Sequence, residues 1–197
     1  MSTKERIYKA ARSCFAAKGY TGTTIADIEQ AAGYSPGSGG LYRHFESKFT
    51  ILEAVIDTEI AANQAATVTV APPPADADPV EVLEQVIRRG LAQLDRQADL
   101  TRILFADLDQ FPTLLTKVRT QLTDATYRDF SNRLSGAHAM GLIPKLDFEA
   151  TTILAIGSVV DFKVKQHLLG FAPLDVDEDR LVKAWVHMFS KLFEVER

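Results

Sequence analysis

The residues best suited to chemistry lie near the start of the chain, in residues 40–48, which read G-L-Y-R-H-F-E-S-K. Tyrosine, arginine, histidine and lysine side chains can donate hydrogen bonds to phosphate oxygens and to the base edges of DNA. A Gly/Ser/Pro-rich turn, residues 34–40, precedes this stretch, and a helical pattern, residues 23–33, precedes the turn. Many DNA-binding proteins place a helix in the major groove through this arrangement of a helix, a turn and a second helix that carries hydrogen-bond donors. The pattern therefore predicts binding to double-stranded DNA.

Three amphipathic elements must hold this stretch in place. Apolar residues recur at helical spacing over residues 3–18, with Lys4, Lys9 and Arg12 on the polar side. Thr23 or Thr24 is predicted to cap a second helix, and Asp27 follows Thr24 at the spacing of a capping box.

Gly33 is predicted to end the second helix, and the turn then leads to a third one. Leu41 and Phe45 are four residues apart in this third helix, so both would face the core of the protein. Tyr42, Arg43 and His44 are then left to face outward.

The rest of the chain also reads as helices, which makes the predicted fold all-α. A longer helix is predicted over residues 47–66, a proline-rich linker over 68–79, and further helices over 79–94, 100–109 and 112–140. The last two helices, residues 148–169 and 176–195, are apolar over more of their circumference than a one-sided surface helix needs. They are expected to form a homodimer interface, and the alternative is a central place in a monomeric core.

Composition and charge narrow the class of protein. The chain has 197 residues, 46% hydrophobic, with one cysteine, Cys14, and no uninterrupted apolar run of about 18 residues. We therefore expect a cytoplasmic protein with no membrane span and no secretion signal. Residues 1–50 contain seven Lys/Arg and four Asp/Glu, a net charge of +3, so the remainder carries −7 of the total of −4. A basic end on an acidic body suits a protein whose phosphate contacts are confined to one module.

The amino-terminal pattern closely resembles the DNA-binding domain of TetR-family transcriptional regulators. The shared positions are Phe15, Gly19, Tyr20, Thr23, Thr24, Ile28, Ala31, Ala32, Gly33, Leu41, Tyr42, His44, Phe45 and Lys48. They agree jointly over about 45 residues, where a lone helix-turn-helix pattern would be a weak signal. One departure is the turn, which spans seven residues here where four or five are common in the family.

The resemblance implies a three-helix helix-turn-helix domain, residues 1–48, followed by a larger helical ligand-binding and dimerisation domain, residues 49–197. It implies a homodimeric repressor that binds a roughly palindromic operator and is released by a small-molecule effector. By the same resemblance Thr24, Tyr42 and Lys48 would bind phosphate, and Gly39, Gly40, Arg43 and His44 would lie along base edges. Ser38 belongs to the same expected DNA-binding set.

A pocket for the effector can be suggested only from residue types. Aromatic walls with a few polar groups are typical of ligand cavities. The candidates in the carboxy-terminal part are Arg102, Phe105, Phe111, Tyr127, Phe130 and Phe162. The alternative for each of them is an ordinary core or surface residue, which is the more common role of such side chains.

Other classes of protein receive less support. The four histidines lie far apart, no metal-binding spacing or phosphate-binding glycine loop is present, and no serine or cysteine nucleophile has a local signature. We therefore expect no enzymatic activity, no metal and no cofactor. The alternative function is a helical adaptor that binds a partner protein through its last two helices and does not bind DNA.

Overall fold

The computed structural model describes residues 2–68 and 77–191, and these residues form helices and connecting turns without a strand. The all-α prediction is therefore confirmed. No helix in this described part of the chain is long and apolar enough to cross a membrane. By packing, the chain divides into two compact units, one made of residues 1–67 and 97–122 and the other of 68–96 and 123–197.

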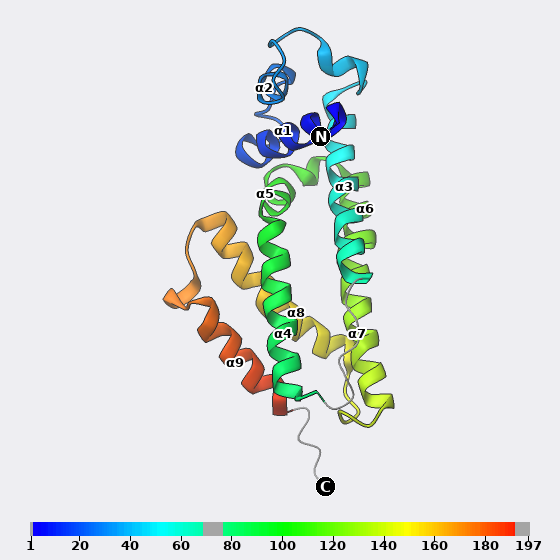
Figure 1. Cartoon of the computed structure of the whole chain (residues 1–197), viewed down its shortest axis with the longest axis vertical. Helices are drawn as coiled ribbons and strands as arrows, with labels where there is room; N and C mark the ends of the chain where they lie inside the picture. The colour runs from blue at the N-terminus through cyan, green and yellow to red at the C-terminus, as the bar shows by residue number, and fades with distance from the viewer. Residues whose placement is uncertain (1, 69–76, 192–197) are drawn as a thin grey trace. The chain divides into compact units, whose positions relative to one another are not determined.

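The first unit begins with α1 (Thr3–Lys18), which Ser2 caps through a capping box with Glu5. It continues with α2 (Ile25–Ala31), the 3₁₀ helix η1 (Gly40–Arg43) and α3 (Lys48–Val68). After residue 96 it contains α5 (Ala98–Ala106), the 3₁₀ helix η2 (Leu108–Gln110) and α6 (Pro112–Val118), followed by a short π-helical segment, η3 (Arg119–Thr123). Helix α1 packs against both α2 and α5 (Figure 1).

The core of the first unit is built on the apolar stripe predicted for α1. Ile7, Ala11 and Phe15 are fully buried and pack with Ile28 of α2 and Leu41 of η1. Burying a large apolar side chain contributes roughly 1.5–3 kcal/mol. These contacts therefore hold η1, which contains the DNA-binding candidates Tyr42 and Arg43, against α1 and α2.

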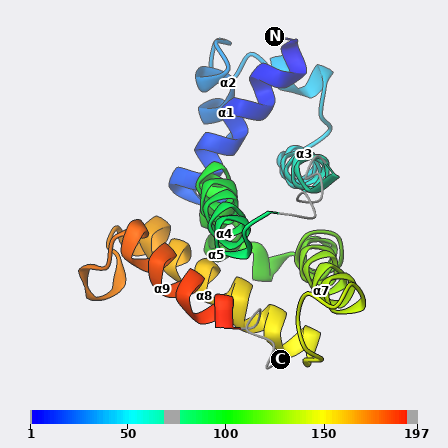
Figure 2. The same cartoon turned by 60° about the horizontal axis from the view of Figure 1, so that its bottom comes forward.

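The second unit contains α4 (Pro79–Arg96), α7 (Asp124–Ala139), α8 (Phe148–Leu169), the 3₁₀ helix η4 (Pro173–Asp175) and α9 (Glu178–Ser190). Helix α4 packs against both α8 and α9, and α7 packs against α8 (Figure 2). The indole N–H of Trp185 in α9 donates to the Ala155 carbonyl of α8 over 3.1 Å. The last helix was predicted to reach residue 195, but residues 192–197 lie outside the described part, as does most of the predicted linker.

The main departure from the predicted elements is the third helix, which is only a four-residue 3₁₀ turn. Gly39 and Gly40 lie at its start, and glycine loses more backbone entropy than other residues on entering a helix. Immediately after it, Ser47 and Thr50 form reciprocal hydrogen bonds of 3.1 Å that cap the start of α3. The segment therefore has too little room between the glycines and the next cap to become an α-helix.

Candidate DNA-reading site

The loop between α1 and α2 ends in the predicted cap. The Thr24 hydroxyl accepts from the Asp27 N–H (3.1 Å), and Asp27 accepts from the Thr24 N–H (2.8 Å). The Lys18 ammonium lies 2.7 Å from the Asp27 carboxylate. Hydrogen bonds from Lys18 and then from Thr24 hold the pKa of Asp27 well below its ordinary value. Thr24 is exposed, so its hydroxyl lies at the surface where a phosphate could approach.

Two consecutive hydrogen-bonded turns connect the end of α2 to η1. Gly33 N–H donates to the Gln30 carbonyl and Tyr34 N–H donates to the Glu29 carbonyl, the two bonds of a Schellman motif. Ser38 N–H then donates to the Ser35 carbonyl, with Pro36 second in this turn and Gly37 third. Gly37 has φ +75°, as the third position of a type II turn requires.

The reading segment, Tyr42 to His44, is exposed, and its side chains have no polar partner in the described chain. Leu41 is fully buried and anchors the 3₁₀ turn, whereas the Tyr42 side chain is 58% exposed and Arg43 and His44 are also exposed. In the described chain, no side-chain hydrogen bond or ion pair involves Tyr42, Arg43 or His44. Three adjacent donor-bearing side chains are thus available to a ligand.

Lys48 does not extend freely into solvent. Its ammonium donates to the backbone carbonyls of Tyr20 and Thr23, each over 2.7 Å, and lies 4.2 Å from the centroid of the Tyr20 ring. Two of its three donors are therefore committed to the loop between α1 and α2. The family resemblance implied only a phosphate-binding role for Lys48, and its role in holding this loop was missed.

Sequence reasoning also missed Glu29, which lies directly beneath the turn. Glu29 is fully buried, and its carboxylate accepts from the Gly37 N–H (2.6 Å) and the Ser38 hydroxyl (3.4 Å). A signal was present in the sequence. Glu29 follows Ile25 by four residues and precedes Ala32 by three, the spacings that place side chains on one face of a helix.

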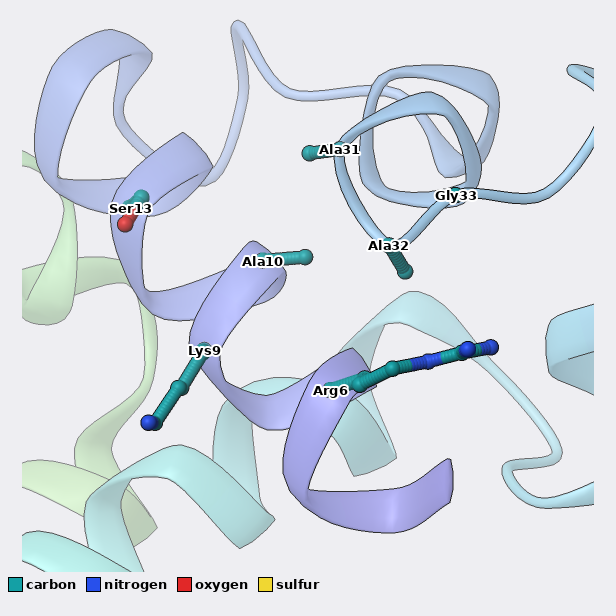
Figure 3. A pocket seen from close by; sticks show the side chains of 7 residues that line it. All are labelled: Arg6, Lys9, Ala10, Ser13, Ala31, Ala32 and Gly33. Carbon is teal, nitrogen blue, oxygen red and sulfur yellow. The ribbon is translucent and has the colours of Figure 1, made fainter. Parts of the chain in front are cut away.

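A surface hollow of about 430 Å³ lies beside this site, between α1 and the end of α2. Figure 3 shows its lining residues, with the Arg6 side chain extended toward the side on which Ala32 and Gly33 lie. The lining consists of Arg6, Lys9, Ala10, Ser13, Ala31, Ala32 and Gly33. None of the effector-binding candidates is among them.

The six effector-binding candidates are divided between the two units. Arg102 forms an ion pair with Asp99 (3.3 Å), Phe105 is 64% exposed, and Phe111 packs on Tyr20 with ring centroids 4.7 Å apart. In the second unit, Phe162 belongs to the buried core and Phe130 packs against that core. Burial raises the pKa of Tyr127, the third candidate there. Their shared role as a pocket stays a prediction.

A metal-dependent site has no geometric support in the described residues. No group of three or more His, Cys, Asp or Glu side chains within residues 2–68 and 77–191 is placed to hold a metal ion. Cys14 is half-buried, and burial raises the pKa of its thiol, which leaves less of the reactive thiolate at neutral pH.

Comparison with known proteins agrees with this geometry. Residues 7–55 match the model of the family described as bacterial regulatory proteins, tetR family. The transcriptional regulator TtgR of Pseudomonas putida is 25% identical over 190 residues, covering 93% of this chain and 88% of its own. The transcriptional repressor AcnR of Corynebacterium efficiens is 36% identical over 69 residues, 35% of each chain.

A solved structure extends the agreement in fold to the whole chain. A regulatory protein of the tetR family from Rhodococcus superposes with a TM-score of 0.71 at 19% identity, covering 100% of both chains. The matched segment includes the capped α2, the turn and the exposed Tyr42–Arg43–His44 stretch. Residues 7–55 therefore form a DNA-binding domain of the kind found in the tetR family of bacterial regulatory proteins, and the chain is a DNA-binding transcriptional regulator.

Proposed function

We propose that this protein is a homodimeric repressor that binds a roughly palindromic operator and leaves it when a small molecule binds. The observation that carries the proposal is the exposure of the Tyr42, Arg43 and His44 side chains, which have no polar partner in the described chain. They follow a turn whose backbone is held by the buried Glu29 carboxylate. Two copies related by a twofold axis would read half-sites about 34 Å apart, one helical turn of DNA.

The roles of individual side chains follow from their chemistry. Thr24, Tyr42 and Lys48 are proposed to bind phosphates, which accept hydrogen bonds regardless of base sequence. Arg43 and His44 are proposed to lie along base edges, where a guanidinium can bind guanine through two hydrogen bonds. The backbone at Ser38, Gly39 and Gly40 completes the proposed surface. An added Cβ at Gly40 would lie 3.0 Å from the Tyr34 ring, so a larger residue there would require that ring to shift.

Exposed apolar side chains on the last two helices support the proposed dimer. Ile153 and Leu154 of α8 are 59% and 69% exposed, and Met188 of α9 is 65% exposed. Gly157 and Ala184 lie one helical turn from them, where small residues allow a second helix to approach closely. Such apolar patches on a monomer are unusual unless a partner covers them. A second copy of the chain is the proposed occupant.

The proposed release by an effector requires two states of the dimer. A small molecule can lower operator affinity only if it binds the non-binding state more tightly than the binding state. Arg102, Phe105 and Phe111 belong to the first unit, so the effector contacts proposed here are those of Tyr127, Phe130 and Phe162 in the second unit. These residues offer aromatic surface and few charges, which suits an apolar or aromatic effector.

Selection of bound fragments from a random duplex library is the direct test. The protein should enrich one roughly palindromic sequence, and its affinity should fall steeply as salt rises, because bound phosphates release counterions. Repeating the selection with candidate small molecules should identify an effector by loss of the enriched fragments. A protein that retains no duplex even in dilute buffer would instead fit the adaptor function.

A further inference from the structure

The turn that leads into the reading segment rests on one buried carboxylate. Glu29 has 0% exposure, and one of its oxygens accepts from the Gly37 N–H over 2.6 Å. Its other oxygen accepts from the Ser38 hydroxyl over 3.4 Å. A buried carboxylate is costly unless its oxygens accept hydrogen bonds. The carboxylate and the turn therefore stabilise each other.

Glu29 also holds the turn at its beginning. Its backbone carbonyl accepts from the Tyr34 N–H over 2.8 Å, while its side chain holds Gly37 and Ser38. The Ser38 hydroxyl in turn accepts from the Gly40 N–H over 3.3 Å. A continuous series of hydrogen bonds thus extends from the interior of α2 to the first residue of η1.

This support matters because the turn has little stiffness of its own. It spans seven residues, three of them glycines, so ordering it costs more conformational entropy than ordering a shorter turn. Arg43 lies three residues after Gly40. A side chain that reads a base must be held to within about 0.5 Å of its working position.

We propose that Glu29 is a positioning residue for sequence recognition, which fixes the turn so that Arg43 and His44 reach their bases. Glu29 itself touches no DNA, because it is fully buried. The proposal rests on the proposed function, since it concerns how that function selects its sequence. This role separates selectivity from affinity, because the proposed phosphate-binding residues Thr24 and Lys48 lie at the start of α2, whereas Glu29 holds the turn that follows its end.

Four single variants test the proposal. Glu29→Ala removes both side-chain acceptors, whereas Glu29→Gln keeps an oxygen that can accept from the Gly37 N–H. Ser38→Ala removes the hydroxyl that joins Glu29 to Gly40, and it leaves the acceptor for the Gly37 N–H in place. Gln30→Ala, at the exposed neighbour on the same helix, is the matched control.

The measurement is affinity for the selected operator and for an unrelated duplex at one salt concentration. Glu29→Ala should lose roughly 10- to 100-fold in operator affinity and less than about threefold on unrelated DNA. Glu29→Gln and Gln30→Ala should stay within about fivefold of the wild type on both, since neither removes the acceptor for Gly37. Equal losses on both duplexes would overturn the proposal, and so would an unchanged ratio of the two affinities.

Hydrogen exchange without DNA provides a second, independent readout. The amides of Gly37 and Gly40 should exchange at least about tenfold faster in Glu29→Ala, and that of Gly40 alone in Ser38→Ala. If Glu29→Ala does not fold, Ser38→Ala still decides, because Ser38 is exposed. Unchanged exchange in the folded variants overturns the proposal. A wild-type protein that selects no sequence overturns the proposed function, and with it this role.

Discussion

The Tyr8 hydroxyl of α1 donates a hydrogen bond to the carboxylate of Glu59 on α3, 51 residues further along the chain. Glu59 is 6% exposed and also pairs with the Arg12 guanidinium over 3.0 Å. Burial and the Glu59 carboxylate both hold the pKa of Tyr8 above its ordinary value. This polar cluster joins the helix that supports the reading segment to α3 inside an otherwise apolar core.

Tyr8→Phe should therefore lower the free energy of unfolding by about 1–3 kcal/mol, because it removes a hydrogen bond to a buried charge and leaves that charge less satisfied. Tyr42→Phe makes the same chemical change at a side chain that is 58% exposed, and should stay within about 0.5 kcal/mol of the wild type. Urea denaturation of the two variants compares them directly. Equal stabilities would show that the Tyr8 bond contributes nothing.

Lys48→Ala should reduce both stability and general DNA affinity. The ammonium donates to the carbonyls of Tyr20 and Thr23, and hydrogen bonds from a charged group contribute about 1.5–3 kcal/mol. Losing them should loosen the loop that presents Thr24 and weaken binding to all duplexes by a similar factor. Lys9→Ala, which removes an exposed lysine of α1, is the control for charge. If stability is unchanged while DNA binding falls, Lys48 acts at the phosphate alone.

Local signals predicted most of the elements. The Thr24 and Asp27 capping box, Gly33 and the period of Ile7, Ala11 and Phe15 each act over a few residues, so the sequence alone was sufficient to locate α1 and α2. The predicted and observed bounds of α8 agree for the same reason, because Asp147 caps its start and Gly170 ends it.

The parts that were missed depend on contacts across the fold. Lys163 follows Val159 by four residues on the inward face of α8, yet its partner Asp95 lies 68 residues away. Spacing within one helix can show that a charge points inward, but not what neutralises it. The second role of Lys48 and the support from Glu29 were missed because both involve backbone groups in turns, which leave no trace in residue type. The same limit explains why the proposed effector pocket stays a prediction.

Arg43→Ala should change which operator is preferred, while Tyr42→Phe should not. Arg43 is proposed to read a base, so its loss should reduce discrimination at that position by roughly 10- to 100-fold. Tyr42 is proposed to bind a phosphate, and loss of its hydroxyl should weaken all duplexes about equally, by roughly tenfold or less. Selection from a random library reports both effects. An unchanged preference in Arg43→Ala would assign base reading to another residue.

Lys163→Met should destabilise the second unit in a pH-dependent way. Lys163 is 2% exposed, and its ammonium lies 2.8 Å from Asp95 and also pairs with Glu178. Burial alone would raise the pKa of Asp95, but hydrogen bonds from Lys163 and His167 bring it below its ordinary value. A depressed carboxyl pKa stabilises the fold above the ordinary value of about 3.9 and ceases to do so as the pH falls through the folded value.

The stability difference between the wild type and Lys163→Met should thus be full at pH 7 and shrink below about pH 4. Methionine replaces the stem of the lysine and keeps most of its packing, so the variant tests the charge. Lys165→Met, at an ion pair with Asp161 that is partly exposed on the same helix, should cost less than about 0.5 kcal/mol at either pH. A difference that is constant from pH 7 to pH 3 would exclude the Asp95 pair as its source.

Leu154→Glu should separate the proposed dimer. Leu154 is 69% exposed on α8, and a twofold interface would bring the residue and its copy close together, so the substitution places two charges in one apolar contact. Light scattering should give about twice the 21.7 kDa chain mass for the wild type and the single-chain mass for the variant. Leu115→Glu, at a leucine 47% exposed on α6, should keep the wild-type mass. Because both half-sites must bind together, the monomer should also lose most of its operator affinity, and a Leu154→Glu protein that stays dimeric would place the interface elsewhere.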